Sequence, residues 1–144
     1  MKSYVLALLT VASMPLLTGC NSLGGVPEFV QAGITPLALH PGDTALVSID
    51  VKDKNDIIAS IVGVIEEEPS RKLKLHDDGE EGDVKAGDDT WSLAVQVPLE
   101  APPGNFNLTF TAYRGDGVAV PIRADDGTIE TLSVHIPLTI TLKQ

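Results

Sequence analysis

The chain has 144 residues, with 20 acidic and 10 basic side chains and a formal net charge of −10 at pH 7. This excess of negative charge argues against nucleic acid and anionic lipid surfaces as partners, because both are bound through Lys and Arg. Cys20 is the single cysteine, which excludes an internal disulfide and a metal site built from cysteines.

The start of the chain has the pattern of an export signal. Lys2 supplies a positive charge, and a mostly apolar stretch follows over residues 4–17. That stretch is too short for a permanent membrane helix, which needs about 20 apolar residues. Small residues then lead to Cys20. The sequence therefore predicts a cleaved signal peptide over residues 1–19.

The segment Leu17-Thr18-Gly19-Cys20 resembles the lipobox of bacterial lipoproteins, which consists of Leu, a small residue, Gly or Ala, and then Cys. In that family the Cys sulfur receives a diacylglyceryl group, the chain is cut before the Cys, and the new amine is acylated. The resemblance implies that acyl chains on Cys20, palmitate among them, hold the protein on a membrane, since two or more chains anchor stably. The alternative is a secretory signal that ends by chance near a buried cysteine.

Residues 20–25 are rich in Gly and Ser and are expected to form a flexible tether. Residue 21 is Asn and not Asp. By resemblance to lipoprotein sorting, Asn21 implies the outer membrane if the host has two membranes, and otherwise the outer face of the cell membrane. The remaining residues, 26–144, are expected to form one domain.

From residue 26 the apolar pattern has period two, which is typical of strands with one buried face. Turn residues at 40–43 and a polar segment at 52–56 separate the first strands. Basic residues alternate with leucine from Arg71 to Leu75, and basic side chains facing solvent would protect a sheet edge from pairing with other molecules. The strands expected in this half are residues 34–39, 44–51, 57–65 and 71–75.

Residues 77–91 form an acidic, glycine-containing loop between two expected strands, and they hold seven of the 20 acidic residues. The loop resembles a motif of bacterial surface and secreted proteins with immunoglobulin-like domains, D-D-G-x-x-G-D-x-x-A-G-D-G-x-[YW]. It departs from the motif at Asp89, where the usual residue is Gly. The turn that follows the motif is matched by Pro103-Gly104-Asn105-Phe106. The resemblance implies this fold and a surface setting.

The acidic loop 77–89 is also a candidate calcium site. Ca²⁺ takes six to eight oxygen ligands, and an acidic loop with free backbone carbonyls supplies them within one segment. Asp78, Asp83 and Asp88 recur every five residues and are the candidate ligands, although this is not the spacing of an EF-hand. The alternative is that each Asp caps a turn through its own side chain while the Glu residues stay in solvent.

Strand patterns resume after the loop. Trp91 begins an alternating segment and is expected in the core, with a stacking platform for sugar as the alternative. Asp126-Gly127 is a strong turn signal for a small hairpin. Pro137 has no N–H to donate and must lie at an edge or a bulge. The strands expected in this half are residues 91–97, 106–113, 118–122, 128–132 and 132–142.

With the small hairpin left out or counted as one unit, these are seven or eight short strands, and without a helical segment after the signal they predict an all-β sandwich or barrel. Turn signals about every 8 to 12 residues favour an antiparallel, immunoglobulin-like β-sandwich. The Cys…Trp…Cys hallmark of antibody domains is absent, so packing alone must hold the two sheets together.

The sequence contains no catalytic signature. It lacks a Gly-x-Ser-x-Gly elbow, and His40, His76 and His135 lie in separate segments without metal-site spacing. We therefore expect a non-catalytic binding or structural module anchored at the bacterial envelope, with an envelope protein or polysaccharide as partner. The alternatives are a calcium-binding surface domain stiffened through the acidic loop and an unrecognised enzyme.

Overall fold

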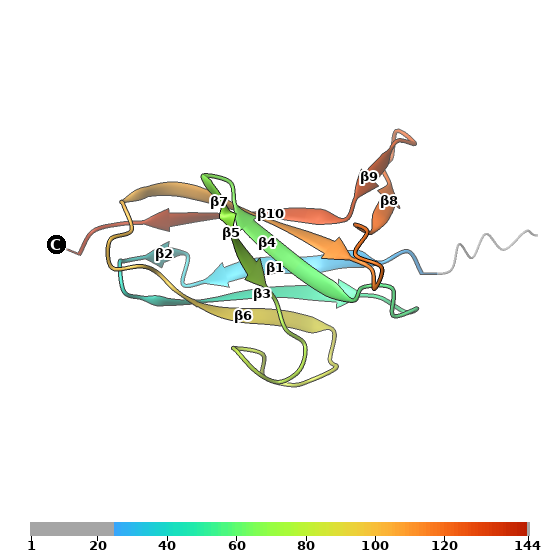
Figure 1. The fold of residues 1–144 in the computed structure, drawn as a ribbon, viewed down its shortest axis with the longest axis horizontal. Helices are drawn as coiled ribbons and strands as arrows, with labels where there is room; N and C mark the ends of the chain where they lie inside the picture. The colour runs from blue at the N-terminus through green and yellow to red at the C-terminus, as the bar shows by residue number, and fades with distance from the viewer. Residues whose placement is uncertain (1–24, 144) are drawn as a thin grey trace, which may run out of the picture.

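The computed structural model describes residues 25–143, which contain ten strands and no helix (Figure 1). In this range there is consequently no helix with the length and hydropathy that a membrane crossing requires. The predicted signal peptide 1–19, Cys20 and residues 21–24 of the tether lie outside the described residues. Signal cleavage and lipidation therefore stay predictions.

Two main sheets face each other, and a small hairpin extends from one of them (Figure 1). The first sheet has the order β1 (Glu28–Thr35), β3 (Thr44–Lys52), β6 (Thr90–Gln96). The second has the order β2 (Ala38–Leu39), β10 (Ser133–Ile140), β7 (Gly104–Tyr113), β4 (Ser60–Ile65), β5 (Glu68–Lys74). The hairpin consists of β8 (Pro121–Arg123) and β9 (Ile129–Thr131). All pairs are antiparallel except β2 with β10.

This topology is an immunoglobulin-like β-sandwich, as the sequence predicted. The chain passes from one sheet to the other between β3 and β4 and between β6 and β7, which are the crossovers of a Greek key. The two main sheets together hold eight strands. The predicted fold class and the predicted hairpin after residue 118 are both confirmed.

The first strand differs most from its prediction. Residues 34–39 were expected to form one strand, but β1 begins at Glu28 and ends at Thr35, before Pro36. Pro36 has no N–H for a ladder, and after Leu37 the chain joins the other sheet as β2. Between Phe29 and Gln31 the pairing with β3 shifts at a bulge. A bulge disturbs the alternation of side chains, which explains why the period-two pattern did not show this strand.

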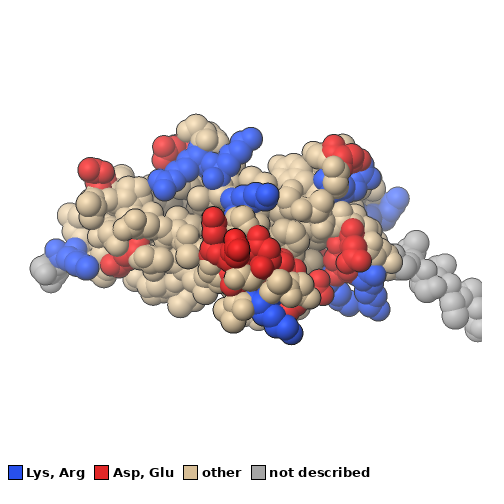
Figure 2. Space-filling model, turned by 60° about the horizontal axis from the view of Figure 1, so that its bottom comes forward, with Lys and Arg blue, Asp and Glu red and all other residues tan. Residues whose placement is uncertain are grey.

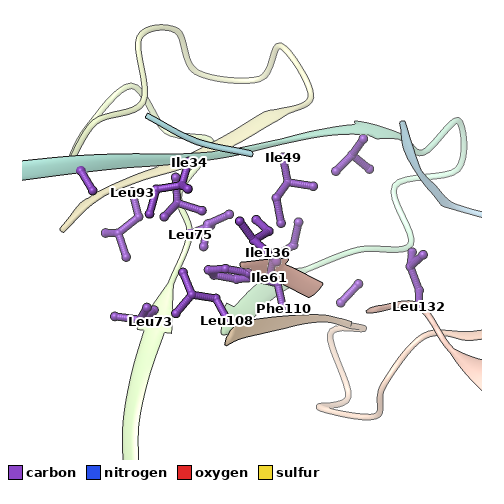
Figure 3. Close-up of a cluster of buried hydrophobic side chains, with 14 of the residues drawn as sticks. Ile34, Ile49, Ile61, Leu73, Leu75, Leu93, Leu108, Phe110, Leu132 and Ile136 are labelled. Atoms are coloured by element: carbon purple, nitrogen blue, oxygen red, sulfur yellow. The ribbon is translucent and has the colours of Figure 1, made fainter. Parts of the chain in front are cut away.

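The core lies between the sheets and consists mostly of the alternate, inward-facing residues of the long strands, with residues next to strand ends such as Leu75 and Leu132 added to them (Figure 3). Val47, Ile49, Ile61 and Phe110 have no exposed surface. Phe110 packs over Gly63 of the neighbouring strand β4, where a Cβ atom would lie 2.7 Å from the Phe110 Cζ. The absence of a side chain at residue 63 therefore makes room for the largest fully buried side chain of the core.

The two ends of the sandwich differ. Where β1 begins, Glu28 pairs with Lys52 at the end of β3, and the β8–β9 hairpin extends at this end (Figure 1). The opposite end, which carries the C-terminus, contains the turns at 40–43, 66–67 and 97–103, and there Ile140 pairs with Gly104. The Asn55 side chain, shortly after the end of β3, donates to the Gly25 carbonyl at 3.3 Å, so Gly25 lies at the end with the hairpin and not at the end with the turn at 97–103.

Candidate functional site

The acidic loop 77–89 begins where the chain crosses between the two sheets. The Leu75 N–H donates to the Ile61 carbonyl of β4 at 3.0 Å. The next residue, His76, pairs with Ser92 of β6 through two backbone hydrogen bonds of 2.8 Å each. The loop then folds back beside β6, which leaves Ser92 only 4% exposed.

Glycine holds the loop against β6 at one position. Gly82 has a φ of +105°, and a Cβ atom there would lie 2.6 Å from the Ala94 backbone nitrogen. That same nitrogen donates to the Glu81 carbonyl at 2.7 Å. Only a residue without a side chain permits this approach of the two backbones.

Asp89, where the motif usually has Gly, retains a left-handed backbone with a φ of +65°. Asp is among the residues that tolerate this conformation best after Gly. The Asp89 carbonyl accepts a hydrogen bond of 2.9 Å from the Val51 N–H of β3. The departure from the motif at Asp89 therefore accompanies an ordered turn that is tied to the sheet.

The Asp carboxylates of the loop accept hydrogen bonds from its own backbone. The Asp77 Oδ1 accepts from the N–H of Gly87 at 2.9 Å and of Asp88 at 3.2 Å. The Asp83 Oδ2 accepts from the Gly79 N–H at 2.6 Å. Asp88 accepts from a backbone N–H two residues ahead at 3.1 Å. This is the turn-capping role that the sequence offered as the alternative to metal binding.

The same carboxylates also lie close to one another. One oxygen from each of Asp77, Asp83 and Asp88 lies within 4.8 Å of the other two. Asp83 is buried, at 7% exposed, whereas Asp88 is exposed. Figure 2 shows acidic side chains gathered on this face of the molecule. Oxygens that share one Ca²⁺ at 2.3–2.6 Å lie up to about 5 Å apart, so the spacing suits this cation.

The structure brings together two of the three candidate ligands named from the sequence. Asp83 and Asp88 belong to the cluster, and the third member is Asp77. Asp78 lies outside it, because its carboxylate accepts from the Glu80 N–H at 3.0 Å and contacts the His76 Nδ1 at 3.3 Å. The five-residue spacing selected Asp78. The position of Asp77 directly after the strand crossing was the signal that could have found the actual third member.

His76 lies between two carboxylates at the base of the loop. Its Nδ1 is 3.3 Å from Asp78 and its Nε2 is 3.4 Å from Glu81. Partial desolvation raises the pKa of the Asp78 carboxyl, but the Glu80 N–H and His76 outweigh it and hold the pKa below its usual value.

Trp91 is partly buried and packs against the core, which confirms the core interpretation.

Comparison with known proteins gives no family. No family model matches the chain, and no curated protein matches it. Among solved structures, the Pseudomonas fluorescens alkylpurine DNA glycosylase AlkC bound to abasic-site DNA has a TM-score of 0.49 at 10% identity, over 82% of this chain and 31% of that one. Fibronectin(III)-like modules of Clostridium thermocellum CbhA have a TM-score of 0.42 at 11% identity, over 82% of this chain and 48% of that one.

A Niemann-Pick type C2 protein from the Japanese carpenter ant has a TM-score of 0.44 at 12% identity, over 84% of this chain and 96% of that one. This chain spans less than half the length of the first two structures. At this level of similarity, none of the three bears on what this chain does.

Proposed function

We propose that the chain is a lipoprotein of the bacterial envelope whose immunoglobulin-like domain acts as a non-catalytic binding module. The lipobox pattern at Leu17-Thr18-Gly19-Cys20 supports the anchor. The observation that carries the proposal is that the described chain starts at one end of the sandwich, where Gly25 accepts a hydrogen bond from Asn55 and β1 begins (Figure 1). Cys20 precedes Gly25 by five residues, which span at most about 18 Å.

A tether of this length fixes which end of the domain faces the membrane. The end with Gly25 and the β8–β9 hairpin stays close to the lipid surface, because the tether is shorter than the sandwich strands that follow it. The opposite end, with the turns at 40–43, 66–67 and 97–103, is presented to a partner in the envelope. An envelope protein or polysaccharide is the partner class that this setting favours.

Membrane fractionation tests the anchor. Cys20→Ser removes the thiol that would form the thioether, and the variant is expected to leave the membrane fraction. Ser22→Ala changes a neighbouring residue without touching the thiol and is expected to stay with the membranes. A Cys20→Ser variant that still sediments with membranes contradicts the proposal.

In a host with two membranes, Asn21→Asp tests the sorting signal. The resemblance to lipoproteins predicts that the wild-type chain fractionates with the outer membrane and that the variant moves to the inner one. Equal distribution of the two chains would show that Asn21 does not direct this protein.

A second candidate function is calcium binding by the acidic loop, which the close approach of the Asp77, Asp83 and Asp88 carboxylates favours. Each carboxylate has oxygen lone pairs beyond those that accept backbone hydrogens. Ca²⁺ at a hundred times its dissociation constant would add about 2.7 kcal/mol to the free energy of unfolding. The bound ion would stiffen the loop against β6.

Thermal unfolding with Ca²⁺ and with chelator tests this second function. Ca²⁺ is expected to raise the melting temperature of the wild-type chain, and Asp88→Asn is expected to remove most of the increase. Glu80→Gln removes a charge from the same loop outside the cluster and is the matched control. A melting temperature that changes with neither Ca²⁺ nor chelator ends the calcium proposal.

A further inference from the structure

A cavity of about 380 Å³ opens between the two sheets at the end opposite Gly25. Its inner wall consists of core side chains, among them Val47, Leu73, Leu108 and Ile140, all less than 9% exposed. Ligand pockets in proteins have volumes of about 300–1,000 Å³ and mostly apolar walls with a few polar groups. The cavity therefore has the size and lining of a site for an apolar small molecule.

The chain path explains why the sandwich is open there. After β5 the chain crosses between the sheets at two residues, since Leu75 still hydrogen-bonds to β4 and His76 pairs with β6, and this crossing closes the gap between the sheet edges. The strands on either side of the crossing, β5 and β6, are edge strands of different sheets and do not pair with each other. The lining of the cavity includes Glu68 and Arg71 of β5 together with Gln96 of β6 and residues of the turn at 97–103. Glu68 and Gln96 are exposed, so the mouth of the cavity lies between β5 and β6.

Arg71 is the cation at this mouth. It was expected to face solvent with the other basic residues of its strand, but it shares the inward face of β5 with Leu73 and is partly buried, whereas Lys72 and Lys74 are exposed. Among residues 25–143, no carboxylate forms an ion pair with Arg71 and no group hydrogen-bonds to its side chain. A guanidinium carries a permanent charge and a planar fork of donors, which suits a carboxylate.

Three carboxylates also line the mouth, those of Glu67, Glu68 and Glu100, but their residues are exposed. Water and salt screen charges in such positions. Arg71 is the charged residue of the lining that is partly buried, so its charge acts on a bound ligand with the least screening. This difference in burial favours an acidic headgroup over a basic one.

We propose that this cavity binds a single-chain amphiphile with one carboxylate, such as a fatty acid, with its tail between the sheets and its carboxylate on Arg71. A cavity of 150 Å³ holds benzene, so a cavity of 380 Å³ accommodates a tail of up to about 15 carbons by proportion. The inference rests on the proposed role of the domain as a binding module and not on its anchor.

Binding of dodecanoate, below the concentration at which it forms micelles, tests the inference. The protein is the full chain with Cys20→Ser, so that acyl chains on Cys20 do not compete for the cavity. Calorimetric titration is expected to show one dodecanoate per chain and a higher melting temperature. Arg71→Gln is expected to weaken binding about ten- to a hundredfold, because it removes hydrogen bonds to a charged group.

Lys72→Gln is the matched control, since it removes the same charge from the neighbouring, exposed position and is expected to leave the dissociation constant within about twofold. Ala101→Phe places a ring at the cavity wall and is expected to abolish binding without lowering the melting temperature. The inference is overturned if dodecanoate does not bind, if Arg71→Gln and Lys72→Gln weaken it equally, or if dodecyltrimethylammonium binds as tightly. Release of Cys20→Ser from membranes is measured separately, so failure of the anchor and failure of the cavity are distinguishable.

Discussion

Gly63→Ala is expected to destabilise the domain strongly, although it adds a single methyl group. Gly63 pairs with Phe110 across β4 and β7. An added Cβ would lie 2.7 Å from the Phe110 Cζ and closer still to two other ring carbons. Favourable carbon contacts begin at about 3.5 Å, so the ring or the strand has to move by about 1 Å. Phe110 has no exposed surface, which leaves the ring no free space to enter.

The expected loss is about 2 kcal/mol of the free energy of unfolding. Overpacking a core costs about 1–3 kcal/mol, and a clash with three carbons of a fully buried ring puts Gly63→Ala at the upper end, from which the restriction of the unfolded chain by Ala recovers about 0.4–1 kcal/mol. For a domain of this size, that loss lowers the melting temperature by about 6–10 °C. Thermal unfolding followed by circular dichroism measures the change directly.

Gly33→Ala is the matched control, because a Cβ atom at this other strand glycine has no heavy atom within 4 Å outside its chain neighbours. Its melting temperature is expected to rise by about 1–5 °C, because nothing opposes the gain from restricting the unfolded chain. Phe110→Leu removes the ring, and Gly63→Ala should cost less in that background. The packing argument fails if Gly63→Ala and Gly33→Ala have the same melting temperature.

Two further predictions concern the acidic loop and pH. Gly82→Ala should lower the melting temperature and expose the loop to proteolysis, because its Cβ would meet the Ala94 backbone. Gly87→Ala has open space around the added Cβ and should cost only the strain of a positive φ, about 1 kcal/mol. Equal proteolysis of both variants would refute this. The His40 N–H and side chain hold the pKa of the Asp43 carboxyl below its usual value, so Asp43 stabilises the fold above the unfolded pKa of about 3.9 and loses this effect as pH falls through its lowered folded pKa. Asp43→Asn should therefore be less stable than wild type at neutral pH and approach it in acid, and parallel stability curves across pH would contradict the assignment.

The sequence predicted the strands whose side chains alternate without interruption. β3, β6, β7 and β10 each present one apolar face, and all four were located within about two residues. β1 was placed too late because of its bulge, and β5 begins earlier than expected because a two-residue turn connects it to β4. These features depend on pairing with a neighbouring strand, which a single-strand pattern does not contain.

The candidate site was only partly accessible from the sequence. Acid spacing identified Asp83 and Asp88, but the choice between Asp77 and Asp78 depends on how the turn at Gly79 directs each side chain. Arg71 lies two residues before Leu73, so the alternating pattern puts both side chains on the same face of β5. A cation on that inward face reaches a ligand only where the two sheets separate and form the cavity. The place where the sheets separate depends on where the chain crosses between them at His76. His76 pairs with Ser92, which lies 16 residues further along the chain, and a pattern within one strand does not contain such a contact.

The most direct test of the proposed function is mass spectrometry of the N-terminal peptide from protein extracted from membranes. The proposal predicts a peptide that begins at Cys20 and carries a diacylglyceryl group on sulfur. A membrane-extracted chain that begins elsewhere, or that carries an unmodified Cys20 thiol, would contradict the lipid anchor on which the proposed orientation of the domain depends.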